Sequence, residues 1–327
     1  MKKHLFNNKV VLITGGTGSF GKKFIKIVLD EYNPKKLIVF SRDELKQFEM
    51  DQQFAEHADK IRYFIGDVRD KDRLMRAFNG VDYVVHAAAL KQVPAMEYNP
   101  SEAIKTNIQG AMNIIDVAIE RKIKKVIALS TDKACNPINL YGATKLCSDK
   151  LFVAANSYSG EAGTKFAVVR YGNVVGSRGS VVPFFKAKAK EGVLPITDQR
   201  MTRFWITLEQ GVRFVIMNFE RMCGGELFVP KIPSMNIMGL AKAVAPNCKT
   251  KMVGIRPGEK LHEVMISVDD ARDTVELDDC YIIQPAFHWW RKDNHSIGKP
   301  VSDDFTYSSD KNKEWLTIPQ LRKMIEA

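Results

Sequence analysis

The sequence predicts an α/β protein that has a Rossmann-like, doubly wound parallel sheet and a smaller C-terminal lobe for substrate. Short apolar, β-branched runs alternate with segments of helical periodicity along the first half of the chain. Such alternation is typical of parallel sheets whose functional site lies at the carboxyl edge of the strands. The first apolar run leads into a glycine-rich turn, and a Tyr-x-x-x-Lys motif follows the fifth run. Both motifs are therefore expected at the same edge.

The first predicted strand and helix enclose a glycine turn of the dinucleotide-binding type. The strand is residues 9–14 (KVVLIT), the helix is residues 22–30, and the turn between them reads GGTGSFG. Glycines let the backbone approach a pyrophosphate closely, and free N–H groups at the start of a helix favour its negative charge. The expected cofactor contacts of this turn are Gly15, Thr17, Gly18, Ser19, Phe20 and Gly21.

The end of the second predicted strand, residues 37–40 (LIVF), bears on the choice between NAD and NADP. A carboxylate at this point binds the ribose 2′-hydroxyl of NAD, whereas an arginine accommodates the 2′-phosphate of NADP. Here Ser41 and Arg42 come first and Asp43 is third, so NADP is the expected cofactor and NAD the alternative. The cofactor contacts predicted from this segment are Ser41, Arg42, Asp43, Glu44, Leu45 and Lys46.

The alternation of strands and helices continues along the chain. Small side chains at residues 87–89 leave room for a nucleotide at the end of a strand. The remaining predicted strands are residues 62–65, 82–86, 125–130 and 165–170, and the helices are residues 44–54, 72–78, 101–121 and 141–155. Further cofactor contacts are expected at Asp67, Val68, Ala87, Ala89, Lys91 and Thr106.

Residues 130–145, reading STDKACNPINLYGATK, carry the predicted catalytic groups. Tyr141 and Lys145 are four residues apart, so they share one face of a helix. An ammonium group near a phenol stabilises the phenolate and lowers its pKa, and the hydroxyl of Thr131 can polarise the same oxygen. Such a phenolate can take the proton of an alcohol while a hydride leaves its carbon. Tyr-x-x-x-Lys alone also occurs on ordinary surface helices, but here it follows the other motifs.

A polar, glycine-rich segment follows the sixth predicted strand, at residues 171–180 (YGNVVGSRGS). Asn173 can donate hydrogen bonds to a sugar or a diphosphate, and Arg178 can neutralise a phosphate. A structural loop before a helix beginning near Pro183 is the alternative interpretation. Downstream, Thr202-Arg203 and Arg256 with Glu259 are further candidates for nucleotide contact, because arginine binds diphosphate through paired hydrogen bonds.

Together these segments resemble the extended short-chain dehydrogenase/reductase superfamily, and within it the inverting UDP-N-acetylglucosamine 4,6-dehydratases. The resemblance extends over essentially the whole chain. Its strings are TGGTGSFGK, SRDELKQ, GDVRD, HAAALKQVPAMEYNP, STDKACNPINLYGATKL, RYGNVVGSRGSVVPFF, MTRFWI and RPGEKLHE.

The resemblance implies a dehydration driven by an internal hydride transfer. Tyr141, assisted by Lys145 and Thr131, would remove the 4-hydroxyl proton of the sugar while NADP⁺ takes the C4 hydride. The C5 proton and the 6-hydroxyl then leave, and the hydride returns to C6. The product would be UDP-2-acetamido-2,6-dideoxy-beta-L-arabino-hexos-4-ulose, the first intermediate toward pseudaminic acid for flagellin or surface glycans.

The elimination also needs an acid and a base, for which the resemblance nominates Asp132 and Lys133. Retaining relatives carry Asp-Glu here, whereas this chain has Asp-Lys. Burial can lower the pKa of a lysine enough for it to act as a base, which is the role expected for Lys133; a phosphate-neutralising or structural lysine is the alternative. The substrate contacts implied are Lys91, Thr131, Asp132, Asn173, Val174, Val175, Gly176, Ser177, Arg178, Thr202, Arg256 and Glu259.

Three alternatives to the inverting dehydratase stay open. A retaining 4,6-dehydratase or a 4-epimerase would use the same Tyr/Lys pair, although an epimerase has no need of Asp132 and Lys133. A non-catalytic regulator that senses NADP would be expected to lack Tyr141 or Lys145. The formal net charge of +11 is compatible with nucleic-acid binding, but the basic residues are scattered along the chain, so phosphate-bearing ligands account for it better.

The length of 327 residues suits one α/β domain with a smaller lobe. We expect the NADP-binding Rossmann domain at residues 1–172, with a return segment near residues 206–230. The UDP-sugar lobe and the C-terminal tail would take residues 173–205 and 231–327.

Composition favours a cytoplasmic protein. No apolar run approaches the ~20 residues of a membrane span, and the N-terminus MKKHLFNN lacks the apolar segment of a signal peptide. The five cysteines have no metal-ligand spacing, and a buried thiol is expected for Cys135, so no metal site is predicted. We expect a homo-oligomer, either a dimer or a hexamer, without membrane or nucleic-acid partners.

Overall fold

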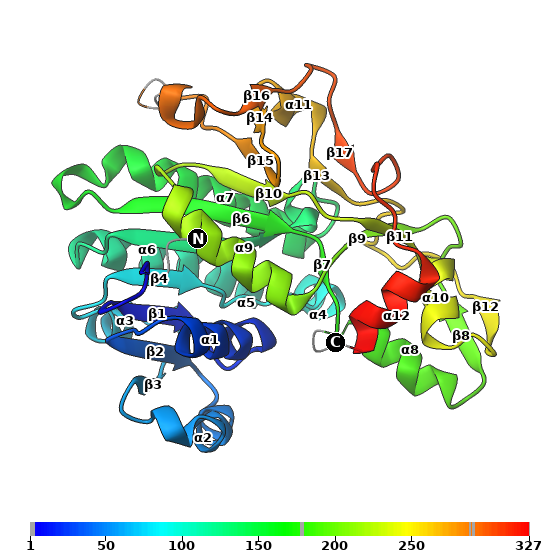
Figure 1. Ribbon diagram of the computed structural model, residues 1–327, viewed down its shortest axis with the longest axis horizontal. Coiled ribbons are helices and arrows are strands. Elements are labelled where there is room, and N and C mark those ends of the chain that lie inside the picture. Colours follow the sequence, from blue (N-terminus) through cyan, green and yellow to red (C-terminus); the bar gives the residue numbers. More distant parts are fainter. Residues whose placement is uncertain (1–3, 177–179, 288, 290–291, 327) are drawn as a thin grey trace.

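A sheet of ten strands forms the centre of the protein, as the computed structural model shows (Figure 1). The structure describes residues 4–176, 180–287, 289 and 292–326. In spatial order the strands are β16 (Lys299–Pro300), β14 (Thr274–Glu276), β15 (Cys280–Ile283), β10 (Leu227–Pro230), β6 (Lys165–Tyr171), β5 (Lys125–Thr131), β4 (Tyr83–His86), β1 (Val10–Thr14), β2 (Lys36–Ser41) and β3 (Ile61–Ile65).

All pairings from β3 across to β10 are parallel, which confirms the predicted fold class. The strand order β3-β2-β1-β4-β5-β6 reverses direction between β1 and β4. In open α/β sheets, ligands bind outside the carboxyl ends of the strands at such a reversal. Strands β1, β2 and β6 are apolar and almost fully buried, as expected for a sheet covered on both faces.

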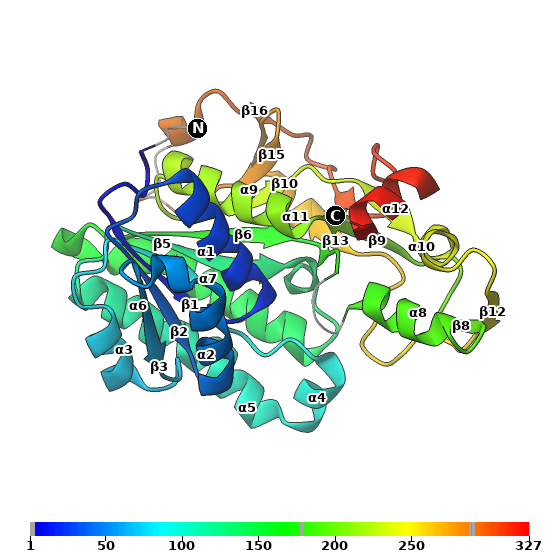
Figure 2. The same ribbon diagram turned by 60° about the horizontal axis from the view of Figure 1, so that its bottom comes forward.

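Helices cover both faces of the sheet (Figure 2). On one face α1 packs beside α9, and on the other α6 packs between α3 and α7. The helices are α1 (Ser19–Glu31), α2 (Glu44–Gln53), α3 (Lys71–Ala77), α4 (Val93–Tyr98), α5 (Pro100–Ile104), α6 (Gly110–Glu120), α7 (Leu140–Tyr158), α8 (Val181–Ala189), α9 (Leu208–Arg221), α10 (Ile237–Val244), α11 (Val268–Ala271) and α12 (Ile318–Glu326).

The helix expected at residues 101–121 is interrupted. It consists of α5, one π-helical turn at Lys105–Gln109, and α6. The turn places Asn107 so that its side chain accepts from Leu90 N at 2.8 Å and donates to Leu90 O at 3.0 Å and to Thr144 Oγ1 at 3.0 Å. Single π-helical turns often occur at functional sites. This one connects the segment after β4 to helix α7.

A second hydrophobic core lies beside the sheet, toward the right of Figure 1. It includes Val182, Leu194, Trp205, Leu240 and Leu321, which come from five elements between α8 and α12. Three small sheets belong to this later part of the chain: β7 (Asn173–Val174) with β9 (Thr202–Ile206) and β11 (Ser234–Asn236), β8 (Val193–Ile196) with β12 (Lys249–Met252), and β13 (Val264–Ile266) with β17 (Tyr307–Ser308).

The far edge of the central sheet differs from the expected arrangement. We expected residues 231–327 in the lobe or the tail, but β14, β15 and β16 of this range extend the central sheet (Figure 1). They pair antiparallel beyond β10, the segment whose return to the main sheet was expected and which pairs parallel with β6. Within the described residues, none of the helices has the length and apolar character that crossing a membrane requires.

The contact between Gly21 and Gly16 should be intolerant of a side chain. A Cβ at Gly21 in α1 would collide with the carbonyl oxygen of Gly16, whereas a Cβ at Gly211 in α9 has no neighbour closer than 4.0 Å. We expect Gly21→Ala to lower the free energy of unfolding by about 1–3 kcal/mol. Gly211→Ala should leave it unchanged or raise it by up to ~1 kcal/mol. Urea denaturation of both variants tests this, and equal stabilities would contradict it.

Candidate active site

A cleft of about 830 Å³ opens at the carboxyl edge of the sheet, between the central sheet and the later part of the chain. It is bounded by the glycine turn and by the ends of β2, β4, β5 and β6. The residues predicted as site residues that line it are Gly15, Thr17, Gly18, Ser19, Phe20, Ser41, Arg42, Asp43, Lys46, Asp67, Val68, Ala87, Ala89, Lys91, Thr106, Thr131, Lys133, Tyr141, Lys145, Asn173 and Val174.

The glycine turn fits a dinucleotide. Gly15 has φ +66, and a Cβ there would lie 3.0 Å from the backbone of Ala88 at the end of β4. Gly18 is the N-cap of α1, so free N–H groups of this helix face the cleft. The hydroxyl of Thr14 accepts from Ala87 N and Ala88 N, each at 3.2 Å. These contacts hold the ends of β1 and β4 together where a cofactor can approach the backbone.

Basic side chains surround the end of β2. Arg42 is more than half exposed and lies 3.6 Å from Asp67 Oδ2. Asp43 caps α2, accepting from Lys46 N at 3.0 Å, and its other oxygen pairs with the ammonium of Lys46. The carboxylate of Asp43 thus serves the helix and Lys46, while Arg42 is the more exposed of the two cations that line the cleft here.

Three of the side chains predicted to be catalytic, those of Thr131, Asp132 and Lys133, lie at the end of β5 and in the turn that follows it. Thr131 Oγ1 donates to Asp132 Oδ1 at 2.9 Å, and the same oxygen accepts from Lys133 Nζ at 3.0 Å. Glu263, which directly precedes β13, brings its Oε1 to 3.3 Å from Lys133 Nζ. Asp132 is fully buried and does not line the cleft, whereas Lys133 does. The amine of Lys133 therefore faces the cleft from between two buried carboxylates.

Tyr141 lies in the first turn of α7, which faces the same turn after β5. The side chain of Asn139 caps this helix, accepting from Gly142 N at 2.8 Å. The pKa of Tyr141 is raised in the protein without ligands, whereas we expected it to be lowered, because burial outweighs the opposing effects of Lys133 and of a hydrogen bond with Thr131. Lys133 thus joins Lys145, the cation expected from the sequence, as a positive charge that lines the cleft with this phenol. Burial also lowers the pKa of Lys145 itself, and Asp149 opposes that shift.

The structure corrects the expected protonation of Lys133. Burial alone would lower its pKa, but Asp132 and Glu263 outweigh burial, and the pKa is raised. Lys133 is therefore an ammonium in the protein without substrate. To act as a base it must first pass its proton to a neighbour, and Asp132 Oδ1 is 3.0 Å away.

Several predicted site residues lie outside the cleft. The hydroxyl of Thr202 is buried, 2.8 Å from His262 Nδ1 and 2.7 Å from Ser309 Oγ. Arg256 is exposed and pairs with Glu259 at 3.7 Å. Gly21 packs on Gly16 beneath the turn. Ser177 and Arg178 fall outside the described residues. The predicted residues that are described but do not line the cleft are Gly21, Glu44, Leu45, Asp132, Val175, Gly176, Thr202, Arg256 and Glu259.

Sequence reasoning missed Glu263 and Tyr171. Tyr171 ends β6 and lines the cleft, and burial and the neighbouring Tyr141 raise its pKa. Its position at a strand end was the signal that could have identified it. Glu263 lies within the string RPGEKLHE, but its approach to Lys133 depends on tertiary contacts. Arg203, a candidate for nucleotide contact, instead donates to backbone carbonyls of residues 202, 260 and 261.

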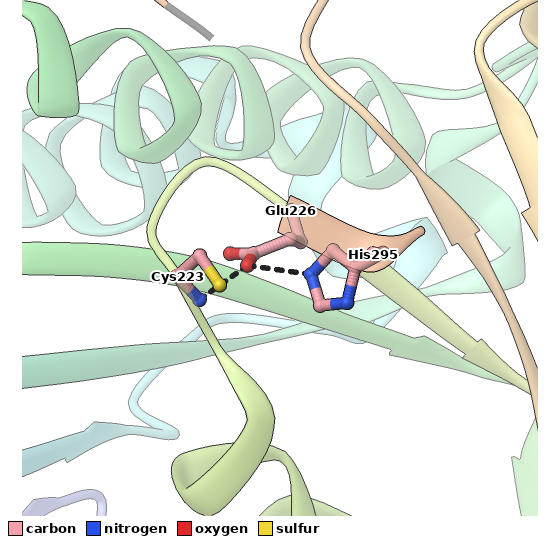
Figure 3. Close-up of side chains that lie close together, drawn as sticks. All are labelled: Cys223, Glu226 and His295. Atoms are coloured by element: carbon pink, nitrogen blue, oxygen red, sulfur yellow. Dashed lines mark hydrogen bonds and ion pairs between the residues drawn. The ribbon is translucent and has the colours of Figure 1, made fainter. Parts of the chain in front are cut away.

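A cluster of metal-ligand types lies away from the cleft, at Cys223, Glu226 and His295 (Figure 3). Their ligand atoms lie within 4.8 Å of one another, a proximity that sequence spacing did not predict because His295 is 69 residues from Glu226. Glu226 is fully buried, and it accepts from Cys223 N, from Gly224 N at 2.8 Å and from His295 Nε2 at 3.0 Å. These bonds join residues 292–298 to the turn before β10, which accounts for the cluster structurally.

A Rossmann-like sheet with a glycine turn and a Tyr/Lys pair in one cleft defines the extended short-chain dehydrogenase/reductase class. The chain belongs to the polysaccharide biosynthesis protein family, whose characteristic sequence matches residues 11–285.

Its relatives include dehydratases and epimerases of nucleotide sugars. The inverting UDP-N-acetylglucosamine 4,6-dehydratase of Campylobacter jejuni is 61% identical, over 98% of each chain. A UDP-glucose 4-epimerase of Rickettsia canadensis is 43% identical, over 85% of this chain and 84% of that one. The X-ray structure of Pen from Bacillus thuringiensis has a TM-score of 0.90 at 39% identity, covering 98% of this chain and 99% of that one.

Replacing Arg42 should weaken the binding of NADP more than the binding of NAD. Arg42→Ala removes the exposed charge expected at the 2′-phosphate, and a hydrogen bond to a charged group contributes ~1.5–3 kcal/mol. NADP affinity should fall about tenfold or more while NAD affinity changes little, as isothermal titration calorimetry can measure. Arg62→Ala, on an exposed position of β3, is the control. An equal loss of affinity for both cofactors would show that Arg42 does not bind the 2′-phosphate.

Proposed function

We propose that this protein is an NADP-dependent, C5-inverting UDP-N-acetylglucosamine 4,6-dehydratase. One observation carries the proposal: Tyr141, Thr131 and Lys133 meet in the cleft that the glycine turn bounds. The high identity to the Campylobacter jejuni enzyme of that name, over nearly the whole of both chains, supports the same activity. Arg42 and Lys46 at the end of β2 favour NADP.

The cofactor supplies redox chemistry, and the chain supplies proton transfer. The glycine turn and the residues at the end of β2 would hold the cofactor, which would supply hydride transfer between C4 and C6 of the sugar. Tyr141 takes the proton of the 4-hydroxyl, with Thr131 and Lys133 stabilising its phenolate. The ketone that forms at C4 acidifies the proton at C5, which prepares the elimination.

Lys133 and Asp132 act in the elimination as a pair that shares protons. The ammonium of Lys133 passes its proton to Asp132, 3.0 Å away, and the free amine takes the proton from C5. The pair now holds two protons, and one returns to the departing 6-hydroxyl so that water leaves. The pair ends with the single proton with which it began. A proton from solvent then reaches C5 from the opposite face and inverts that centre, and Tyr141 releases to solvent the proton it took from the 4-hydroxyl, so that each group ends as it began.

The cleft also has groups suited to a UDP-sugar. Asn173 and Val174 line it where β6 leads into β7, and Lys91 lines it after β4. Burial lowers the pKa of Lys91. We assign Asn173 and Lys91, with Ser177 and Arg178 from the residues outside the structure, to the sugar and the diphosphate. The described positions of Thr202, Arg256 and Glu259 favour structural roles instead.

The place of this enzyme follows from its product. We propose that the 4-keto sugar is the first intermediate toward pseudaminic acid for flagellin or surface glycans, made in the cytoplasm by a homo-oligomer. A 4-epimerase is the second candidate, supported by the identity to the Rickettsia canadensis protein. Proton NMR of UDP-N-acetylglucosamine incubated with the protein in heavy water distinguishes them. A dehydratase gives a 6-methyl signal and deuterium at C5, whereas an epimerase gives only a C4-inverted hexosamine.

Tyr141→Phe tests the base at the 4-hydroxyl. The variant keeps the ring and loses the proton acceptor, so turnover should fall about a hundredfold or more. Affinity for UDP-N-acetylglucosamine should change little, as equilibrium binding can show. Tyr158→Phe, at the exposed end of the same helix, should keep wild-type turnover. Near-normal turnover in Tyr141→Phe would place the base elsewhere.

Lys133 variants test the base at C5. Lys133→Ala and Lys133→Met should both abolish formation of the 6-methyl signal, because neither has an amine to take the C5 proton. Slow oxidation at C4 by Tyr141 would remain visible as NADPH absorbance. Lys150→Met, at an exposed position of α7, should be fully active. Wild-type dehydration by either Lys133 variant would exclude Lys133 as the base at C5, and a retained C5 configuration would exclude inversion.

A further inference from the structure

We propose that Glu263 is a positioning residue that holds the amine of Lys133 at the cleft together with Asp132. This inference rests on the proposed function and deepens it, because it concerns the residue assigned to the C5 proton. Glu263 directly precedes β13 and lies far along the chain from the turn after β5. It completes the surroundings of Lys133 from the later part of the chain.

The backbone of Glu263 is held in place on both sides by one residue. Its N–H donates to Ser309 Oγ at 2.9 Å, and its carbonyl accepts from Ser309 N at 2.8 Å. The hydroxyl of Ser309 also lies 2.7 Å from Thr202 Oγ1. The side chain of Glu263 is therefore aimed by contacts that do not involve the cleft.

The carboxylate of Glu263 lies closer to Lys133 than to its other cation. Its Oε1 is 3.3 Å from Lys133 Nζ and 3.6 Å from Arg203 Nε. Arg203 already donates to three backbone carbonyls through its terminal nitrogens, at distances from 2.7 to 3.1 Å. Lys133, by contrast, has carboxylates as its ion-pair partners, Asp132 and Glu263. Glu263 is thus the closer ion-pair partner of Lys133, whereas Arg203 is held mainly by backbone carbonyls.

Burial makes this arrangement costly unless it serves a function. Glu263 is only 2% exposed, and its Oε2 accepts no hydrogen bond from the described residues. Asp132 Oδ2 is likewise buried and accepts no hydrogen bond from the described residues. A buried carboxylate with an unsatisfied oxygen destabilises a fold, so such groups are kept where a site requires their charge. The two carboxylates balance the charges of Lys133 and Arg203.

Glu263 acts through Lys133 and not on the substrate. Lys133 lines the cleft, and Glu263 does not. With Glu263 on one side and Asp132 on the other, Nζ has a fixed location while it exchanges a proton with Asp132. Loss of the Glu263 charge would leave Lys133 with a single carboxylate and less stabilisation of the ammonium. The amine would then be less well placed and more readily deprotonated.

The test compares Glu263→Gln, Glu263→Asp and the control Glu314→Gln in the full-length protein. Glu314 is an exposed acid, so its variant removes the same charge outside the cleft. In Glu263→Gln we expect kcat for dehydration of UDP-N-acetylglucosamine to fall about tenfold or more, with KM within about threefold. Glu263→Asp keeps the charge and should recover part of the loss. Wild-type kcat in Glu263→Gln would overturn the proposal.

A second readout needs no substrate. Acetic anhydride acylates only a neutral amine, and mass spectrometry can compare Lys133 with the exposed Lys150 as internal reference. Removing a nearby negative charge lowers the pKa of a lysine by about one unit or more. Lys133 acylation at pH 8 should therefore be about tenfold faster in Glu263→Gln, intermediate in Glu263→Asp, and unchanged in Glu314→Gln. An unchanged rate in a folded Glu263→Gln protein, checked by circular dichroism, would overturn the proposal.

The two readouts separate this proposal from the proposed function. If the wild-type protein does not dehydrate UDP-N-acetylglucosamine, the proposed function fails, while the acylation of Lys133 still reports its coupling to Glu263. If the wild-type protein does dehydrate it and neither kcat nor acylation responds to Glu263→Gln, only the role of Glu263 fails. Should Glu263→Gln not fold, the Glu263→Asp variant decides, since its shorter side chain withdraws the charge from Lys133 without removing it.

Discussion

Parallel pairing in the central sheet is the constraint on which the cleft depends. Because β1, β2, β4, β5 and β6 run in one direction, their carboxyl ends meet at one edge. The glycine turn, the exposed arginine after β2 and the acid–lysine turn after β5 are therefore neighbours although they are distant in sequence. Each group comes directly after a strand. The backbone before it is fixed by the hydrogen bonds of the sheet, and the backbone after it is free to turn.

Charge balance is the second requirement, and it acts where the sheet meets the later part of the chain. A lysine placed at the end of β5 and shielded from water needs compensation. Asp132 supplies part of it from the neighbouring position in the chain, and Glu263 supplies the rest across a tertiary contact. The same pair of carboxylates explains why burial does not neutralise Lys133. The protonation of this site is thus a property of the folded protein and not of the motif.

Much of the fold followed from the sequence because its signals are local. Strand, glycine turn and helix are adjacent in the chain, and Tyr141 and Lys145 share one helix. Features that depend on distant pairing could not be predicted in this way. The antiparallel strands β14–β16 join the sheet through contacts with β10, and the π-helical turn before α6 is set by Asn107 and its partners. Thr202 and Arg203 have the right chemistry for a nucleotide, but interior partners occupy their polar atoms.

The side-chain amide of Asn139 joins the start of helix α7 to the later part of the chain. Its oxygen accepts from Gly142 N in the first turn of α7, and its nitrogen donates to Gly258 O at 2.8 Å. Gly258 lies between Arg256 and Glu259, in a surface segment that precedes β13. The position of the first turn of α7, which carries Tyr141, is therefore coupled through the amide of Asn139 to the segment around Gly258.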